Sequence, residues 1–467
     1  MKKGLLILGI VSLVALVSVP LTMNVLYFSL PDVYLHTFYG GMKNKIDRLY
    51  QTSGKKIVII GGSSVPFSLD SSLIKECLDG YEVVDFGLYA ALGTNAMLDL
   101  AKDGIKGGDI VIVSPEISKQ TLSMYFNPLE MSKALERNKD MFFKLNGKMQ
   151  EGMIAAIPSF NAEKISYLSK GDIPMPKDIY ASSSFNEYGD IKVTREGNIM
   201  FGGIDKNNPI SIDKALIEDE FIKELNNFAK TVKDKGGECY FRFSPMNASS
   251  ISYKDDLRTF YDYLDEKISF GILGDPYKAI MEKEWFYDTN FHLNSPGAKM
   301  WTKNLINDIK VTLNITSPTP IKDEEKPPLS SPDDSKDGDN SFLDFFEYEE
   351  KENEVVLTKL IKESADIIVP YKYNGKIITS FNDDVFQGKK GIREITIQDN
   401  IRLLYDYSFS GSGVNKIVIS NDRPNSIGVG DHLLNGANAY IYVDKDNLNT
   451  YKTSYNWAKY APYIRAK

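Results

Sequence analysis

The stretch KKIVIIGGSSVPFSLDSSLI, residues 55–74, changes character in its middle. Its apolar run, Ile57–Ile60, is typical of a short strand that is buried on both faces. The run stops at Gly61-Gly62-Ser63-Ser64, and a polar segment that predicts a helix follows it. A strand, a glycine turn and a helix in this order predict the first unit of a parallel α/β sheet.

The same alternation of strand and helix continues to about residue 310. Further strands are predicted at 82–86, 109–114 and 239–244, and helices at 71–78, 93–105, 212–235, 253–267 and 296–309. Strands separated by helices of about 10–15 residues predict a parallel sheet with helices on both faces. We therefore expect an α/β domain over 55–312, with an insertion of little periodicity at about 143–209.

The N-terminus is strongly apolar. Lys2 and Lys3 precede 25 uncharged, mostly apolar residues, Gly4–Phe28, and about 20 suffice to cross a bilayer. A cleaved signal peptide is the alternative, but its apolar core is usually about 7–15 residues long. We expect residues 1–30 to be a retained single-pass anchor and 31–54 a juxtamembrane segment. The lysines then stay in the cytoplasm and the rest of the chain lies outside the cell membrane.

The chain beyond residue 312 divides into a linker and a repeated part. Residues 313–341 include SPTPIKDEEKPPLSSPDDSKDGDN, which is rich in Pro, Ser, Asp and Lys and predicts a disordered linker. Residues 342–467 contain VFQG at 385–388, SFSG at 408–411 and LLNG at 433–436, at spacings of 23 and 25 residues. The short strands IREITI and NKIVIS lie between them. One strand per 20–29 residues is typical of leucine-rich repeats. This module resembles the BspA-like leucine-rich repeats of bacterial surface proteins, and the resemblance implies a small solenoid with a protein ligand as a partner.

Composition excludes several kinds of function. The net charge is −8, so nucleic acid is not an expected partner. Three histidines and two cysteines, Cys77 and Cys239, leave little for a zinc site. The two cysteines form no CxxC motif, and each is predicted to be a small buried hydrophobic residue rather than half of a disulfide.

The Gly-Gly-Ser-Ser turn at residues 61–64 is a candidate part of a functional site. Ligands of open parallel sheets bind at the carboxyl ends of the strands, where this turn is predicted to lie. A serine there is exposed to the crevice, and the next helix offers amides to an anion. The alternative is an ordinary turn whose serines cap the helix. The sequence alone does not separate the two.

A serine nucleophile needs a base, and His292 is the one histidine in the predicted α/β domain. It lies in EWFYDTNFHLNSPGAKMWT, residues 284–302, just before the last predicted helix. Asp288, four residues earlier, is placed to orient the imidazole. Both therefore belong to the same edge of the sheet as Ser63.

The order of these motifs resembles the SGNH (GDSL-type) hydrolase superfamily. IIGGSSVPFSLDS, VVDFGLYAALGTNAML and FYDTNFHLNSPGAKMWT resemble its membrane-anchored bacterial surface members. The resemblance covers about residues 55–310 and implies a flavodoxin-like sheet, Ser63 as nucleophile, His292 as base and Asp288 as the orienting carboxylate. Ser64 is the alternative nucleophile, and the Gly87 amide is expected to bind the oxyanion.

Two departures from the family pattern concern the site. The third block usually supplies an asparagine to the oxyanion, whereas this chain has Pro115-Glu116 there. Asn95 is a candidate substitute, and Glu116 is a candidate substrate contact or a solvated loop residue. The usual Asp-x-x-His is also Asp-x-x-x-His here.

The sequence therefore predicts an extracytoplasmic serine esterase or O-acyltransferase, acting on a cell-wall or surface polysaccharide with acetyl as the expected acyl group. No metal or cofactor is required. The alternative is a catalytically weak surface protein that binds or adheres through its repeats.

Overall fold

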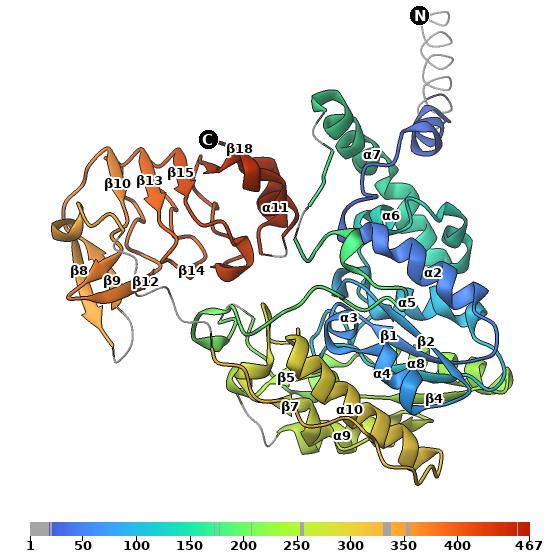
Figure 1. The fold of residues 1–467 in the computed structure, drawn as a ribbon. Helices are drawn as coiled ribbons and strands as arrows, with labels where there is room; N and C mark the ends of the chain where they lie inside the picture. Colours follow the sequence, from blue (N-terminus) through green and yellow to red (C-terminus); the bar gives the residue numbers. More distant parts are fainter. Residues whose placement is uncertain are drawn as a thin grey trace, which may run out of the picture.

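The computed structural model describes residue 18 and residues 21–171, 173–176, 178–206, 208–252, 256–329, 338–351, 355–454 and 456–467. Figure 1 shows a mixed α/β lobe and a strand-rich lobe beside it. We call them the α/β domain (residues 31–329) and the C-terminal module (residues 338–467). Each has its own apolar core.

A five-stranded parallel sheet forms the centre of the α/β domain. Its order is β2-β1-β3-β4-β6, and every neighbouring pair is parallel. The bounds are β1 (Lys55–Gly61), β2 (Tyr81–Gly87), β3 (Ile110–Val113), β4 (Glu238–Phe241) and β6 (Gly271–Ile272). The predicted parallel sheet with flanking helices is confirmed, and the quoted apolar run lies between β2 and β3.

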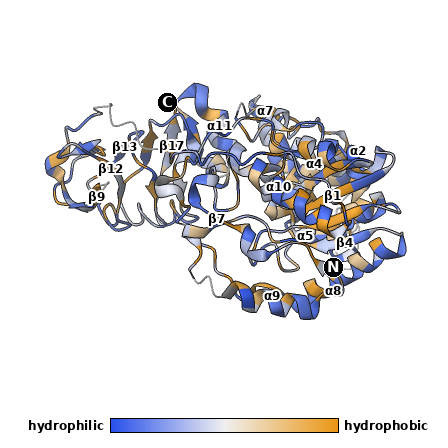
Figure 2. Ribbon diagram, turned by 60° about the horizontal axis from the view of Figure 1, so that its bottom comes forward, coloured by the Kyte–Doolittle hydropathy of each residue, from blue (hydrophilic) through white to orange (hydrophobic). Residues whose placement is uncertain are grey.

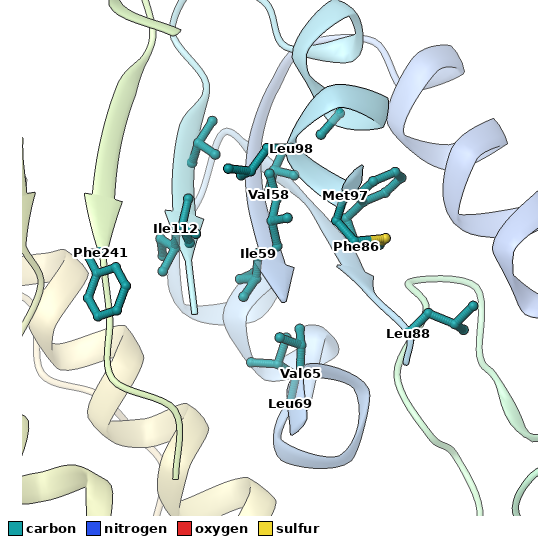
Figure 3. Packing of buried hydrophobic residues seen from close by; sticks show 14 of the residues in the cluster. Val58, Ile59, Val65, Leu69, Phe86, Leu88, Met97, Leu98, Ile112 and Phe241 are labelled. Atoms are coloured by element: carbon teal, nitrogen blue, oxygen red, sulfur yellow. The ribbon is translucent and has the colours of Figure 1, made fainter. Parts of the chain in front are cut away.

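Helices cover both faces of this sheet. They are α2 (Gly41–Gln51), α3 (Ser64–Ser68), α4 (Ser71–Cys77), α5 (Thr94–Ala101), α8 (Asp219–Asp234), α9 (Asp256–Lys267) and α10 (Ser295–Thr312). In Figure 3, Val58 and Phe86 of the sheet lie beside Met97 and Leu98 of α5. Figure 2 shows that hydrophobic residues gather around β1. A short pair, β5 (Met246–Asn247) and β7 (Ile280–Met281), lies apart from this sheet.

The segment predicted to be juxtamembrane belongs to the α/β domain. Phe38, Met42, Ile46 and Leu49 of this segment are buried in the main core, and α2 packs on β2. The predicted anchor falls mostly on residues outside the described part, although residues 21–29 are helical. Within the described residues, no helix has the length and apolar character needed to cross a membrane.

The predicted insertion contains a long helix that the weak periodicity did not indicate. α6 (Pro128–Ala134) packs on α7 (Gly147–Lys170), a helix of 24 residues with Pro158 inside it. Ile157 and Phe160 of α7 form a separate small core with residues 27–34. The apolar partners of α7 thus include the segment that follows the N-terminal helix.

Part of the predicted linker is bound along α10. Lys299 pairs with Glu324 at 3.2 Å and Lys303 with Asp323 at 2.7 Å. The Lys310 ammonium also donates to the Ser317 carbonyl at 3.2 Å. Polar contacts therefore order residues that bury little apolar area. Residues 330–337 of the predicted linker lie outside the described part.

The C-terminal module consists of two mostly parallel sheets. One has the order β10-β13-β15-β17-β18 and is parallel throughout. Its strands are β10 (Asp366–Ile368), β13 (Glu394–Ile397), β15 (Lys416–Ile419), β17 (Tyr440–Val443) and β18 (Ile464–Ala466). Isoleucines stand in register across it, at 367, 395, 417, 441 and 464. All five are buried, so the sheet shares one apolar face.

The second sheet has the order β16-β14-β12-β9-β8, with β11 paired to β12. Its strands are β16 (Gly428–Val429), β14 (Leu403–Leu404), β12 (Lys376–Phe381), β9 (Val355–Leu360), β8 (Phe346–Glu350) and β11 (Lys372–Tyr373), and the chain ends with α11 (Leu448–Thr453) before β18.

The three spaced motifs stack on one another. Gly388, Gly411 and Gly436 have φ of 70°, 65° and 75°, a conformation that glycine adopts without strain. The Gly388 amide donates to the Ser410 carbonyl, and the Gly411 amide donates to the Gly436 carbonyl. Each turn therefore bonds to the next one along the chain.

Candidate active site

Ser63 lies where the chain leaves β1 and enters α3. It is the residue before the first turn of α3, at the carboxyl edge of the sheet. Its Oγ lies 2.8 Å from Nε2 of His292. Both residues are nearly buried, with 6% of Ser63 and 1% of His292 exposed. The hydroxyl and the imidazole therefore meet with little competition from solvent.

Asp288 completes the chain of hydrogen bonds. Its Oδ1 lies 2.8 Å from Nδ1 of His292, and its Oδ2 accepts a 2.7 Å bond from the Tyr180 hydroxyl. Both oxygens of the carboxylate are thus engaged, which fixes its orientation. The additional residue in Asp-x-x-x-His does not turn the carboxylate away from the imidazole.

The loop before α10 is held by its own hydrogen bonds. The His292 amide donates to Oγ1 of Thr289 at 3.0 Å, and the Tyr287 amide donates to the His292 carbonyl at 2.8 Å. Asn294 caps α10 through the Gly297 amide and donates to two carbonyls of the preceding turn. The loop thus presents His292 from a rigid hairpin-like turn.

Two residues that the sequence did not indicate position the imidazole. The Phe67 ring stacks on the His292 ring at 3.9 Å and 12°. The buried Arg195 guanidinium donates to the Phe67 carbonyl at 3.1 Å and to the Leu293 carbonyl at 2.9 Å. It therefore ties α3 to the histidine loop. Burial lowers the pKa of Arg195 to about 10, so the group stays charged at neutral pH.

Ser64 is turned away from the imidazole. Its side chain is buried and lines a small cavity on the side of Trp301 and Leu305, whereas Ser63 and His292 line a different cleft. Its hydroxyl has no hydrogen-bond partner among the described residues. Of the two serines left open by the sequence, the structure therefore brings Ser63 to the histidine.

Glu116 is buried beside the turn at residues 61–64 rather than solvated. Its Oε1 accepts the Ser64 amide at 2.8 Å, and its Oε2 has no partner among the described residues. A Cβ added to Gly62 would overlap the Glu116 carboxylate, which explains the second glycine of the turn. Glu116 also lines the cleft that contains Ser63 and His292.

The structure does not bring the other two predicted oxyanion donors to the cleft. The Gly87 amide donates to Oδ1 of Asp85 at 2.9 Å, so this N–H is already used. Asn95 is buried in α5, which packs on β1 and β2, and it is absent from the cleft lining. The predictions for Gly87 and Asn95 thus differ from the structure, because the Gly87 N–H is bonded within its own strand end and Asn95 is buried where α5 packs on the sheet.

A second motif in the insertion is a structural turn. The composition of SSSFNEYGDI, residues 182–191, suits either a carbohydrate contact or a structured surface turn, and the surface turn is the favoured prediction. In the structure, Oδ1 of Asn186 accepts the amides of Tyr188, Gly189 and Asp190, and the Asp190 carboxylate binds Ser71. These side chains hold the turn together and are not offered to a ligand.

Ser63, Glu116 and His292 open into a cleft of about 820 Å³. This volume lies within the roughly 300–1,000 Å³ that ligand pockets usually have. Among the described residues, no cluster of three or more His, Cys, Asp or Glu side chains could hold a metal ion. Cys77 and Cys239 are free thiols.

The chain matches no protein-family model and no curated protein. A leucine-rich-repeat protein of T. pallidum is 14% identical over 23% of this chain and 71% of that protein, with a TM-score of 0.17. The Bacillus subtilis protein YXIM is 12% identical over 55% of this chain, with a TM-score of 0.26. The matched part spans 57% of YXIM. Both TM-scores are below 0.5, so the function must be inferred from the site itself.

Proposed function

We propose that this chain is a serine esterase or O-acyltransferase of the SGNH (GDSL-type) superfamily. The observation that carries the proposal is the continuous series of hydrogen bonds from Ser63 through His292 to Asp288, at the carboxyl edge of a parallel sheet. The strand order β2-β1-β3-β4-β6 is the flavodoxin-like order, which supports the superfamily assignment.

In the first half of the reaction, His292 Nε2 takes the proton of Ser63 Oγ as that oxygen attacks the ester carbonyl. The tetrahedral oxyanion is assigned to the Ser63 amide, at the N-terminal end of α3. The ester C–O bond then breaks, and the leaving alcohol takes the proton back from the imidazolium. An acyl group remains on Ser63.

In the second half, water or a sugar hydroxyl gives its proton to His292 and attacks the acyl carbon. Ser63 then leaves and recovers the proton. Asp288 stabilises the imidazolium in both halves, and the Tyr180 hydroxyl holds Asp288 in place. Neither half consumes a cofactor.

We further propose that the enzyme is tethered outside the cell membrane by residues 1–30 and acts on a cell-wall or surface polysaccharide, with acetyl as the acyl group. The repeated turns and the parallel register of the C-terminal module support a BspA-like leucine-rich-repeat solenoid.

A fluorophosphonate probe tests the catalytic proposal. We expect it to label the folded protein at Ser63, and labelling to vanish in Ser63→Ala. Ser64→Ala is the matched control and should still be labelled, because its hydroxyl faces another cavity. Absence of labelling in the folded parent would contradict the proposal.

A surface-binding protein is the second candidate, and two observations favour it. The Gly87 amide is bonded to Asp85, and Glu116, which stands where the family pattern has an asparagine, accepts a hydrogen bond from the Ser64 amide instead of offering a donor. Removal of one oxyanion donor typically costs about 2.7–4 kcal/mol of barrier. Such a protein would bind its surface ligand equally well as parent and as Ser63→Ala, with neither form labelled by the probe.

A further inference from the structure

The cleft above Ser63 has walls from both lobes of the molecule. Its floor and one wall come from the α/β domain and include Ser63, Glu116 and His292. The opposite wall comes from the C-terminal module. Its residues there are Val429, Asp431, Asn456 and Lys459. The module therefore contributes directly to the site at which the chemistry is proposed.

The module side of the cleft is held in shape by its own contacts. The Asn456 amide donates to the Ile427 carbonyl at 2.7 Å. The Lys459 ammonium donates to the Val429 carbonyl at 3.2 Å and pairs with Asp431. Trp457, which lies between Asn456 and Lys459 in sequence, is fully buried. Asn456 and Lys459 thus project from a packed edge rather than from a loose loop.

The contact between the lobes continues behind the catalytic residues. A small cavity of about 20 Å³ is lined by Asp288 and Asp205 of the α/β domain and by Arg402, Ser426 and Asn456 of the module. Asn456 lines both this cavity and the large cleft. The wall formed by the C-terminal module therefore extends from Asp288, which bonds to His292, to the large cleft.

The lining chemistry indicates the class of ligand. Three carboxylates, Glu116, Asp205 and Asp431, face only two ammonium groups, Lys119 and Lys459. An excess of negative charge disfavours a phosphate-rich polyanion. The lining also holds three aromatic rings and several amides and hydroxyls: Tyr89, Tyr125, Phe291, Gln120, Asn208, Ser118 and Ser211. Apolar ring faces combined with polar groups suit a neutral chain of many hydroxyls.

We propose that the C-terminal module forms the second wall of a glycan-binding cleft that takes a segment of a neutral polysaccharide across Ser63. The repeats then select the polymer, and the α/β domain acts on it. The acyl chemistry rests on the function proposed above, whereas the binding of the glycan does not.

Calorimetric titration of the full chain carrying Ser63→Ala tests the proposal without turnover. The probes are the β-1,4-linked hexasaccharides of glucose, N-acetylglucosamine and xylose, with poly(glycerol phosphate) as the polyanion. We expect at least one hexasaccharide to bind more tightly than the polyanion. Adding Asn456→Ala and Lys459→Ala together should weaken that binding at least tenfold.

The matched control is Lys359→Ala in the same background. Lys359 lies on β9 of the same module, is 65% exposed in its side chain and does not line the cleft. It should leave the Kd unchanged, and melting temperatures check that all variants are folded. Equal affinity in the folded double variant, stronger binding of poly(glycerol phosphate), or no binding of any hexasaccharide would each overturn the proposal. Glycan binding by a parent protein that the fluorophosphonate probe does not label would refute the esterase and support the cleft.

Discussion

The Ser63 hydroxyl lies 2.8 Å from Nε2 of His292, although the two residues are 229 positions apart. Packing of α10 on α3 brings them together. Thr302 of α10 accepts the Asp70 amide at 2.9 Å, just after α3. Arg195 adds a second bridge between α3 and the histidine loop. The distance is therefore set by the framework and not by the two side chains alone.

Asp288→Asn tests the orienting carboxylate. The variant keeps the shape of the side chain but loses the charge that stabilises the imidazolium, so kcat for p-nitrophenyl acetate should fall by about 10⁴-fold. Asp234→Asn, on the exposed side of α8, removes an equal charge and should leave kcat unchanged. A loss of less than tenfold in Asp288→Asn would contradict the assigned role.

Tyr180→Phe tests the support of that carboxylate. The buried hydroxyl donates to Asp288, and a hydrogen bond to a charged group is worth about 1.5–3 kcal/mol. We expect kcat to fall by about tenfold, which corresponds to about 1.4 kcal/mol of barrier. Tyr50→Phe removes a tyrosine hydrogen bond to the neutral Leu100 carbonyl, outside the cleft, and should lower stability without changing kcat. Equal kcat in both variants would show that Tyr180 serves the fold only.

Gly62→Ala tests the close approach of Glu116 to the turn at residues 61–64. The added methyl group overlaps the carboxylate, and such overpacking usually costs about 1–3 kcal/mol. Glu116→Ala alone leaves the Ser64 amide without its acceptor, at a cost of about 1–3 kcal/mol. Glu116→Ala removes the group that the new methyl overlaps. The double variant should therefore lose less unfolding free energy than the two single variants lose together, by at least about 1 kcal/mol.

Urea unfolding measures this coupling. Gly147→Ala is the control, because a methyl group there meets nothing within 4 Å at the start of α7. Simple addition of the two single effects would show that Gly62 is constrained by something other than Glu116.

Asp178→Asn tests a pH dependence of stability. Burial raises the pKa of Asp178 to about 6, and nearby Asp288 also raises it. The unfolded chain has a pKa near 3.9, so between pH 4 and 6 the folded state binds more protons than the unfolded state. The free energy of unfolding should therefore fall as pH rises through this window, by about 2–3 kcal/mol. The contribution is fully present below pH 4.

The asparagine variant lacks this proton and should not show that fall. The unfolding free energy of the variant minus that of the parent, measured in urea, should therefore rise from pH 4 to pH 7 by about 2–3 kcal/mol. A difference that is constant with pH would contradict the assignment.

The central sheet and the meeting of Ser63 with His292 could be predicted because they follow from general rules. Ile57–Ile60 is a short apolar run bounded by glycines, and the carboxyl ends of parallel strands share one edge. The loop before the last helix lies at this same edge, so the histidine in that loop is placed near Ser63. The spacing of the glycines at 388, 411 and 436 likewise predicted a repeated turn.

Other parts of the site depend on contacts that no local pattern encodes. The Gly87 amide is taken by Asp85, an acid inside a buried strand, and this unusual placement is the one signal that the sequence offered. Tyr180 comes from a segment without periodicity. In the sequence, nothing distinguishes Phe67 from any other apolar residue of a short helix. Their positions depend on how the insertion and α10 pack on α3.

The ordered part of the linker has a consequence for how the two walls of the cleft stay together. Lys326 is ion-paired with Glu282 of the α/β domain, and the C-terminal module begins twelve residues later. A chain of twelve residues spans about 40 Å at most, whatever its conformation, so the start of the module stays within that distance of Lys326. The module thus meets the face that carries Ser63 as an intramolecular neighbour, and dilution of the protein leaves that encounter unchanged.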